Sequence, residues 1–384
     1  MTLAPGPVGP PLPRDEFSLA DGVVYLNSAV MSPLPQRAVT AMVADARRAA
    51  AQASAAYDSR MGEVEVVRDA AATLMGVGVD DVAFVRNTTE GLGLVAAGLD
   101  WRTDDAVVVA SRDHPNTVLP WRARSDAGVQ VIAVDRLGPT GALPLDAFAA
   151  ALDAGRGRVR VVAVSWVQAD TGWRADLAAL ARLAHAHGAL LCVDAIQGLG
   201  VVPCALAAWG VDATAAGAQK WMLGPHGIGV AYVAPHLRDR LRVLAPGASS
   251  VIGAIGSELT YRTSARRFES GTHNHTGIAG LGAGLDLLAD AGPDAVWAWV
   301  DHLATRLTDG LGAQGLEVVS ARGDEERSGI VTAVLPGLDP LDAEARLERL
   351  GVVVAARGPG VRFSPHAWNT TAEVDAALTA VASL

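Results

Sequence analysis

Ala216-Gly217-Ala218-Gln219-Lys220-Trp221 contains the only lysine of this chain, and the rest of the sequence is organised around it. The chain has 31 lysines and arginines, so the other 30 are arginines. An arginine guanidinium stays protonated and cannot act as a nucleophile. A primary amine that is desolvated can lose its proton and form a Schiff base with an aldehyde. Lys220 is therefore a candidate nucleophile; the alternative is a surface lysine that survives by chance in an arginine-rich composition.

Helices and strands alternate on both sides of this stretch. Apolar runs typical of strands occur at 23–27, 81–85, 106–110, 129–134, 161–164 and 190–193. Helical periodicity covers 35–51, 64–75, 87–97 and 176–187. Strands that are apolar on both faces are typical of a parallel sheet covered by helices. The order of elements therefore predicts an α/β fold, an open sheet with helices on both faces.

Composition excludes several classes of function. A chain of 384 residues suits two domains. The net charge of −10 argues against nucleic acid or an anionic membrane as partner. Cys192 and Cys204 are the only cysteines, too few for a disulfide framework or a metal cluster, which suits a reducing cytoplasm. No run of about 18 apolar residues occurs. The start of the chain, residues 1–14, is rich in Pro and Gly and is expected to be a mobile arm rather than a signal peptide, within an N-terminal arm of residues 1–21.

Polar side chains gather just after the predicted strands. In open α/β sheets, ligands bind at the carboxyl ends of the strands. The residues that follow these strands are Thr88, Thr89, Asp113, His114, Asn116, Ser165, Gln168, Asp194 and Gln197, and the Gly217–Lys220 stretch comes next along the chain. Each has a structural alternative: the threonines could cap a helix, and Asp194 could cap a helix or form a buried ion pair. Their convergence on one edge of the sheet favours a ligand site.

This set of groups matches the needs of pyridoxal phosphate. That cofactor requires an amine for its aldehyde, a carboxylate beside its ring nitrogen and hydrogen-bond donors for its phosphate. Lys220 can supply the amine, and Asp194 can supply the carboxylate. Two hydroxyls at the start of a helix, Thr88 and Thr89, are suited to a phosphate.

The chain resembles the class V aminotransferase superfamily of fold-type I pyridoxal phosphate enzymes, and within it the isopenicillin N epimerase-like and cysteine desulfurase-like branch. The segments that carry the resemblance are Tyr25-Leu26-Asn27-Ser28-Ala29, Phe84-Val85-Arg86-Asn87-Thr88-Thr89-Glu90-Gly91, Asp194-Ala195-Ile196-Gln197, Gln219-Lys220, Arg267-Phe268-Glu269-Ser270-Gly271-Thr272, and Val361-Arg362-Phe363-Ser364-Pro365-His366 with Asn369-Thr370. The resemblance implies a large domain, residues 22–286, with a mostly parallel seven-stranded sheet. It also implies a small α+β domain, residues 287–384, and a homodimer.

The resemblance assigns roles around the cofactor ring. Lys220 would hold the cofactor and move the Cα proton of the substrate through an external aldimine and a quinonoid. Asp194 would pair with the ring nitrogen, and Gln197 would bind the phenolic oxygen. His114 is the candidate for stacking on the ring, with Asn116 as the alternative.

The resemblance also assigns roles at the phosphate and the substrate. The phosphate would be bound by Thr88, Thr89, Gln219 and the partner subunit's Thr272. The substrate α-carboxylate would be bound by Arg362 as a bidentate clamp. Arg357 could assist, or could be a solvated loop residue, and Asn27 is a further substrate-binding candidate.

The reaction is expected to be β-elimination, the C–S bond cleavage of a cysteine conjugate. Epimerisation ranks second, before transamination and oxygen-dependent decarboxylating deamination. Relatives that form a persulfide carry a reactive cysteine on a loop before the carboxylate-binding arginine, whereas here only Gly358-Pro359-Gly360-Val361 separates Arg357 from Arg362. The sequence therefore predicts an enzyme that is not a persulfide-forming cysteine desulfurase. Two other classes compete: a pyridoxal-binding regulator, which would carry a basic winged-helix domain, and a relative that has lost its cofactor.

Overall fold

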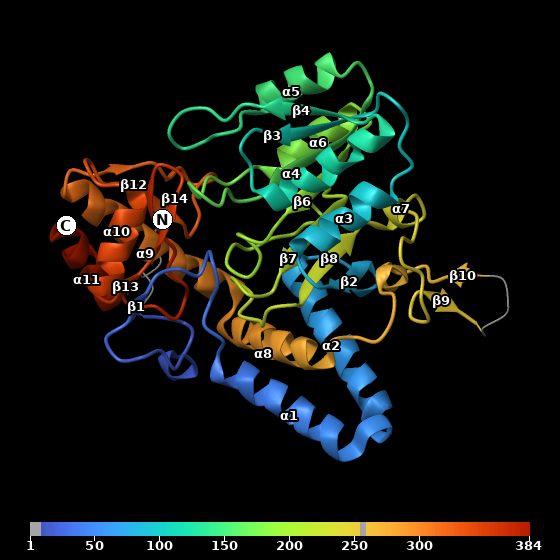
Figure 1. The fold of residues 1–384 in the computed structure, drawn as a ribbon, viewed down its shortest axis with the longest axis horizontal. Coiled ribbons are helices and arrows are strands. Elements are labelled where there is room, and N and C mark those ends of the chain that lie inside the picture. Colours follow the sequence, from blue (N-terminus) through green and yellow to red (C-terminus); the bar gives the residue numbers. More distant parts are fainter. Residues whose placement is uncertain (1–8, 254–258) are drawn as a thin grey trace, which may run out of the picture.

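A seven-stranded sheet forms the centre of the computed structural model, which describes residues 9–253 and 259–384 (Figure 1). The strands are β2 (Val82–Val85), β3 (Ala106–Ala110), β4 (Gln130–Val134), β5 (Val159–Ser165), β6 (Leu190–Asp194), β7 (Ala213–Gly217) and β8 (Gly229–Val233). Their spatial order is β2-β8-β7-β6-β5-β3-β4. The neighbours from β7 to β4 are parallel, and β8 is antiparallel to β7 and to β2. This confirms the expected mostly parallel seven-stranded sheet.

Helices cover both faces of this sheet, as expected from strands that are apolar on both sides. One face packs against α3 (Thr88–Gly98), α4 (Pro115–Arg122) and α7 (Pro235–Arg238). The other face packs against α2 (Tyr57–Met75), α5 (Leu145–Ala154), α6 (Leu177–Ala186) and α8 (His275–Ala291). The first helix, α1 (Gln36–Gln52), contacts α8 on the side away from the sheet (Figure 1).

The C-terminal part of the chain forms a separate group of elements beside the large sheet (Figure 1). A four-stranded antiparallel sheet has the order β11 (Glu317–Val318), β12 (Val331–Val334), β15 (Gly360–Phe363), β14 (Ala355–Arg357). The helices of this part are α9 (Pro293–Ala313), α10 (Pro340–Arg349) and α11 (Thr371–Ala382). β1 (Val24–Tyr25) runs parallel to β13 (Val352–Val353). β9 (Val251–Ile252) pairs with β10 (Thr260–Tyr261) elsewhere in the fold.

This arrangement bears on the expected domains. The division at 286 stays a prediction, and α8 runs across it as far as Ala291. The pairing of β1 with β13 attaches the beginning of the predicted large domain to the C-terminal part.

The expectation of a mobile arm over residues 1–14 is wrong for residues 9–14, and the packing continues to Phe17. Leu12 and Phe17 are buried, and the Phe17 ring stacks on Trp368 with centroids 4.9 Å apart. The Leu12 amide donates a hydrogen bond to the Ala367 carbonyl. Two apolar side chains in a Pro-rich segment are enough to hold it against the C-terminal part, because burying each one contributes about 1.5–3 kcal/mol. Residues 1–8 lie outside the described residues.

One helix is longer than the sequence predicts. The helix expected at 64–75 begins earlier, at Tyr57, because the polar residues before Val64 form its solvent-facing first turns. Among the helices of residues 9–253 and 259–384, none has the length and apolar character needed to cross a bilayer.

Candidate active site

The carboxyl ends of β5, β6 and β7 place the expected polar side chains at one edge of the large sheet. Ser165 ends β5 and is paired in register with Asp194, which ends β6. Asp194 is paired in turn with Ala215 of β7, and the chain leaves β7 at Gly217 to reach Lys220. The parallel direction of these strands is therefore the reason that the candidates meet.

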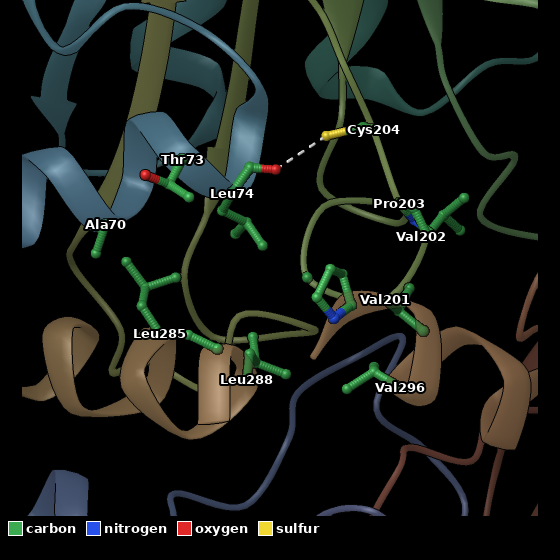
Figure 2. A pocket seen from close by; sticks show the side chains of 13 residues that line it. Ala70, Thr73, Leu74, Val201, Val202, Pro203, Cys204, Leu285, Leu288 and Val296 are labelled. Carbon is green, nitrogen blue, oxygen red and sulfur yellow. Dashed lines mark hydrogen bonds between the residues drawn. The ribbon is translucent and has the colours of Figure 1, made fainter. Parts of the chain in front are cut away.

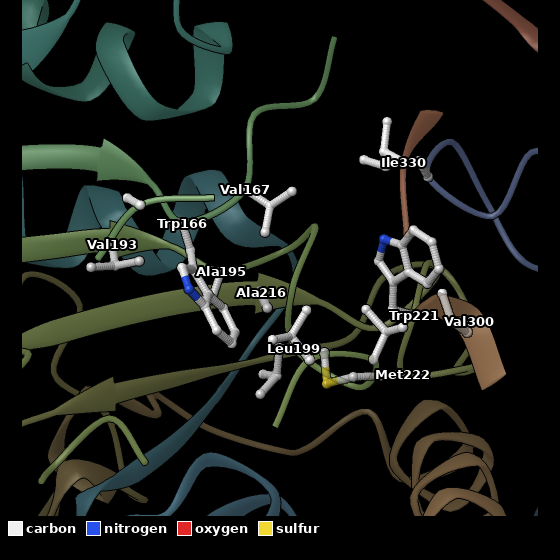
Figure 3. Packing of buried hydrophobic residues seen from close by; sticks show 14 of the residues in the cluster. Trp166, Val167, Val193, Ala195, Leu199, Ala216, Trp221, Met222, Val300 and Ile330 are labelled. Carbon is white, nitrogen blue, oxygen red and sulfur yellow. The ribbon is translucent and has the colours of Figure 1, made fainter. Parts of the chain in front are cut away.

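Lys220 lies in a turn between two anchored segments. The preceding residue, Gln219, accepts a hydrogen bond on its carbonyl from the Ser32 amide at 2.9 Å. The following residue, Trp221, is buried against Val300 and Ile330, as Figure 3 shows. The pKa of the Lys220 amine is lowered to about 8, chiefly by burial. Part of the amine is therefore neutral near physiological pH, as a nucleophile or a base requires.

Asp194 is buried and forms no ion pair within the described chain. Its Oδ1 accepts the Ile196 amide at 3.0 Å, and its Oδ2 accepts the Thr117 hydroxyl at 3.2 Å. Burial raises the pKa of this carboxyl to about 6; the Asp113 carboxylate also raises it, and the Lys220 cation opposes the shift. The alternatives of a helix cap and a buried ion pair are wrong, because no helix begins directly after Asp194 and no side-chain cation of the described residues forms a salt bridge with it.

Arg362 projects from β15 and is 1% exposed. Its Nη1 donates to the Ala169 carbonyl at 2.5 Å, whereas Nε and Nη2 have no partner within the described residues. Burial lowers the pKa of this guanidinium to about 9, and the charge of Arg357 adds to the effect. Arg357 itself is exposed and donates only to the Ala356 carbonyl. The buried, unpaired guanidinium is the better candidate for an anionic ligand.

Further buried polar atoms lack partners within the described residues, and they test whether the expected cofactor and substrate fit. These atoms include Asn27 Oδ1, Ser28 Oγ, Ser32 Oγ and Gln168 Nε2. A buried polar group without a partner costs about 1–3 kcal/mol, so such atoms commonly bind a ligand or water. Together with Arg362, Lys220 and Asp194, they supply the donors and acceptors that an amino acid bound to pyridoxal phosphate requires. The residues fit that cofactor.

The expected phosphate segment has one buried and one exposed threonine. Thr88 is buried, and its Oγ1 accepts the Gly217 amide at 3.0 Å, which joins the start of α3 to the end of β7. Thr89 is exposed, and Asn87 rather than a threonine caps the helix by accepting the Glu90 amide at 2.9 Å. The assignment of Thr88, Thr89 and Gln219 to a phosphate stays a prediction.

The ring-stacking assignment also stays a prediction. His114 is an exposed residue that caps α4, and its Nδ1 accepts the Asn116 amide at 3.2 Å. Although part of the His114 side chain is exposed, the protein around its ring desolvates it and lowers its pKa, and so do the nearby charges of Lys220, Arg357 and Arg362. His114 therefore faces the same region as these groups, and Asn116 lies half-buried beside it.

Gln197 already has protein partners at both ends of its amide. Its Nε2 donates to the Ala29 carbonyl at 3.0 Å, and its Oε1 accepts the Trp221 indole N–H at 2.9 Å. One Nε2 hydrogen remains for a ligand, because a primary amide carries two. The expected contact with a phenolic oxygen remains a prediction that this hydrogen permits.

Thr272 lines a cavity whose lining does not include Lys220. It is exposed beside this cavity of about 450 Å³, which is also lined by Arg86, Glu90 and Gly227. Within the described residues it forms no side-chain hydrogen bond with Thr88, Gln219 or Lys220. Its expected action in a partner subunit stays a prediction.

Three residues near Asp194 were not assigned roles from the sequence. Thr117 was missed altogether, because a threonine in the first turn of α4 has no distinctive local pattern. Asp113 and Ser165 were noted only for following strands, yet both are buried and hydrogen-bonded to one another. Their placement at strand ends was the one signal that could have identified them.

A second, apolar cavity lies away from these groups. It measures about 370 Å³ and is formed mainly by α2, the 200–204 loop, α8 and the start of α9 (Figure 2). Cys204 lines it and donates its thiol hydrogen to the Leu74 carbonyl. Burial raises the pKa of Cys204 to about 12 and that of Cys192 well above its ordinary value. Neither thiol lies on the segment that carries Arg362.

Comparison with known proteins identifies relatives over nearly the whole chain. The family model described as aminotransferase class-V matches residues 24–376. A cysteine desulfurase of Klebsiella pneumoniae is 32% identical, over 92% of this chain and 91% of that protein. An uncharacterized aminotransferase of Bacillus subtilis is 30% identical, over 84% of each chain. The apo structure of a cysteine desulfurase from Thermococcus onnurineus NA1 superposes with a TM-score of 0.87 at 25% identity, over 95% of each chain.

These relatives correct two expectations. The ranking of C–S lyase, epimerase, aminotransferase and decarboxylating deaminase activities is wrong, and so is the exclusion of the cysteine desulfurases, because several relatives across most of the chain carry that name. The exclusion rested on the missing cysteine beside Arg362. The position of a thiol affects where sulfur is carried, but it does not decide which bond of the substrate is broken.

Proposed function

Since this chain belongs to the class-V aminotransferase family, we propose that it is a cysteine desulfurase, which takes the sulfur atom from L-cysteine and leaves L-alanine. The names of its relatives support the substrate. The observation that carries the chemistry is the meeting of a buried amine, a buried carboxylate and a buried guanidinium at one site: Lys220, Asp194 and Arg362. The cofactor is pyridoxal 5′-phosphate.

Each of these three residues has a distinct task. When bound, the cofactor withdraws electrons from the substrate Cα, which makes the Cα proton acidic. Lys220, with a pKa of about 8, accepts and returns that proton near neutral pH. Asp194, as a carboxylate, would pair with the ring nitrogen and keep it protonated.

Arg362 fixes the substrate. Its Nε and Nη2 groups are free to bind both oxygens of an α-carboxylate, and burial removes competing water. Holding the carboxylate at two points also sets the direction of the Cα–H bond relative to the base. That orientation selects the bond that is broken first.

The test is a product assay with L-cysteine and the pyridoxal phosphate-loaded enzyme. Because Cys192 is buried and Cys204 lines the apolar cavity away from Arg362, the assay supplies dithiothreitol as the sulfur acceptor. Desulfurisation forms one L-alanine and one sulfide per cysteine, while one dithiothreitol is oxidised to its disulfide. Pyruvate and ammonia in place of alanine would refute the proposal, since they report β-elimination.

The expected homodimer is part of this proposal. Exposed apolar side chains on α1 and α2, among them Val39, Val43 and Val66, offer a surface for a second copy. Light scattering should give twice the chain mass of 39.4 kDa. Mixing two inactive variants, Thr272→Val and Lys220→Ala, should restore activity if the partner subunit's Thr272 serves the opposite site; no recovery would argue against this role.

A cytoplasmic location is also proposed, in keeping with two free cysteines.

A further inference from the structure

A chain of hydrogen bonds joins two buried carboxylates at the active site. The Ser165 hydroxyl contacts Asp113 Oδ1 at 2.6 Å and Thr117 Oγ1 at 3.0 Å. Thr117 Oγ1 in turn contacts Asp194 Oδ2 at 3.2 Å. All four side chains are buried, with exposed fractions between 1% and 8%. Asp113 has no part in the roles described above.

The number of protons in this series of hydrogen bonds determines the charge of its two carboxyl groups. Three oxygen–oxygen contacts run from Asp113 to Asp194, and each of the two hydroxyls carries one proton. If both carboxyls are ionised, one contact has no proton and two lone pairs oppose each other in a dry interior. One additional proton gives every contact a hydrogen bond. A second additional proton would find no free acceptor among these three contacts.

The surroundings agree with a single additional proton. Burial raises the pKa of Asp113 and that of Asp194, the latter to about 6, so ionising both together is unfavourable. The cations that face these carboxyls are Arg136 near Asp113 and Lys220 near Asp194. Arg136 is already engaged by two hydrogen bonds to Asp170.

The backbone around Asp113 also favours a fixed geometry. Its Oδ1 accepts the His114 amide at 2.7 Å, and its Oδ2 accepts the Ser165 amide at 2.9 Å. These bonds hold the Asp113 carboxyl against the Ser165 hydroxyl, whether or not it carries a proton. The adjacent His114 ring points its Nδ1 at the Asn116 amide rather than at Asp113.

We propose that Asp113 and Asp194 share one proton through Ser165 and Thr117, and that a cationic ring bound at Asp194 moves this proton to Asp113. In the move, Asp194 gives its proton to Thr117, Thr117 gives its own to Ser165, and Ser165 gives its own to Asp113. Three O–H bonds break and three form. Asp113 is thus a positioning residue that keeps Asp194 ionised. The inference rests on the proposed function only for the identity of the cationic ring.

Infrared spectroscopy of apo-protein and pyridoxal phosphate-loaded protein at neutral pH tests this proposal. A protonated carboxylic acid has a C=O stretch separate from that of carboxylates, and [¹³C]aspartate labelling assigns it to aspartate. We expect one such band in both forms of the wild type and a change of its frequency when the cofactor binds. In the loaded protein the band should be lost in Asp113→Asn and retained in Asp105→Asn.

Asp105 is a matched control because it is also buried, lies before β3 instead of after it, and is bound to Arg160. The shared proton is refuted if the loaded wild type lacks the band or if Asp113→Asn keeps it. A band that does not respond to cofactor refutes the proton movement. Absence of desulfurase activity leaves these spectra unaffected, so a failure of the proposed function is distinguishable.

A second pair of variants keeps both carboxyl groups and changes only the Ser165 hydroxyl that lies between them. Ser165→Ala removes the central hydroxyl, so cofactor binding should no longer move the band to the frequency of the Asp113 acid in the loaded wild type. Ser165→Thr keeps a hydroxyl and should restore the response. A cofactor-induced change of wild-type size in Ser165→Ala would overturn the relay, provided that circular dichroism shows a native fold.

Discussion

Replacing Arg362 with lysine should damage substrate binding and turnover together. In the structure, Arg362 Nη1 is held by the Ala169 carbonyl, and Nε and Nη2 remain for a ligand. A lysine keeps the positive charge but presents one ammonium in place of a planar fork. It cannot contact both carboxylate oxygens and the Ala169 carbonyl at once.

The expected loss follows from the number of hydrogen bonds removed. One hydrogen bond to a charged group contributes about 1.5–3 kcal/mol. Since about 1.4 kcal/mol corresponds to a factor of ten in rate, kcat/KM should fall by roughly 10- to 100-fold. Part of the loss should appear in kcat, because the remaining single contact leaves the Cα–H bond free to turn away from Lys220.

The assay is alanine formation from L-cysteine, with kcat and KM measured separately. Arg357→Lys is the matched control, because Arg357 is exposed and exposed ion pairs contribute only about 0.2–1 kcal/mol. Cysteamine, which lacks the carboxylate, should inhibit the wild type far less than L-alanine does, and this difference should shrink in Arg362→Lys. A larger loss in Arg357→Lys than in Arg362→Lys would refute the reasoning.

Three further predictions concern the Lys220 amine, the buried ion pair between Arg68 and Glu269, and the packing of Phe17. In the apo-protein, labelling of Lys220 by trinitrobenzenesulfonate, followed by peptide mass spectrometry, should rise with a midpoint near pH 8, and a midpoint near 10.5 would show a solvated amine. Glu269→Gln should lower the free energy of unfolding by about 3–5 kcal/mol, because it removes the buried one of the two carboxylates that pair with the fully buried Arg68. The half-exposed neighbour Glu65 is the control: Glu65→Gln should cost less than about 1 kcal/mol in the same urea titration. Phe17→Ala should cost about 3–5 kcal/mol by thermal unfolding, whereas an unchanged melting temperature would favour a free arm.

The strands of the large sheet could be predicted from the sequence because their signal is local. A strand buried on both faces needs an unbroken apolar run, and β3 and β6 show this pattern in full. The end of each run then gives the position of the polar side chain that follows it. For this reason Asp194 could be assigned to the edge before any tertiary contact was known, whereas β7, the strand that leads to Lys220, was not among the predicted strands.

The packing of the N-terminal segment could not be predicted in the same way. Phe17 and Leu12 lie in a Pro-rich stretch that has no helical or strand periodicity. Their partners, Trp368 and Ala367, lie near the other end of the chain. A short apolar segment does not specify its partner, because hydrophobic burial is not directional.

The sequence by itself determined the α/β class, the single lysine and the set of residues that follow the strands, because each depends on residue type and order. Only the tertiary structure decided which of these side chains lose contact with water and which touch. It left Arg362 buried with free donors and Arg357 exposed, although both are arginines on neighbouring strands. It also joined Asp113 to Asp194 through two hydroxyls from separate elements. Burial and contact set the charge states of these groups, and both arise from packing between segments that are distant in the sequence.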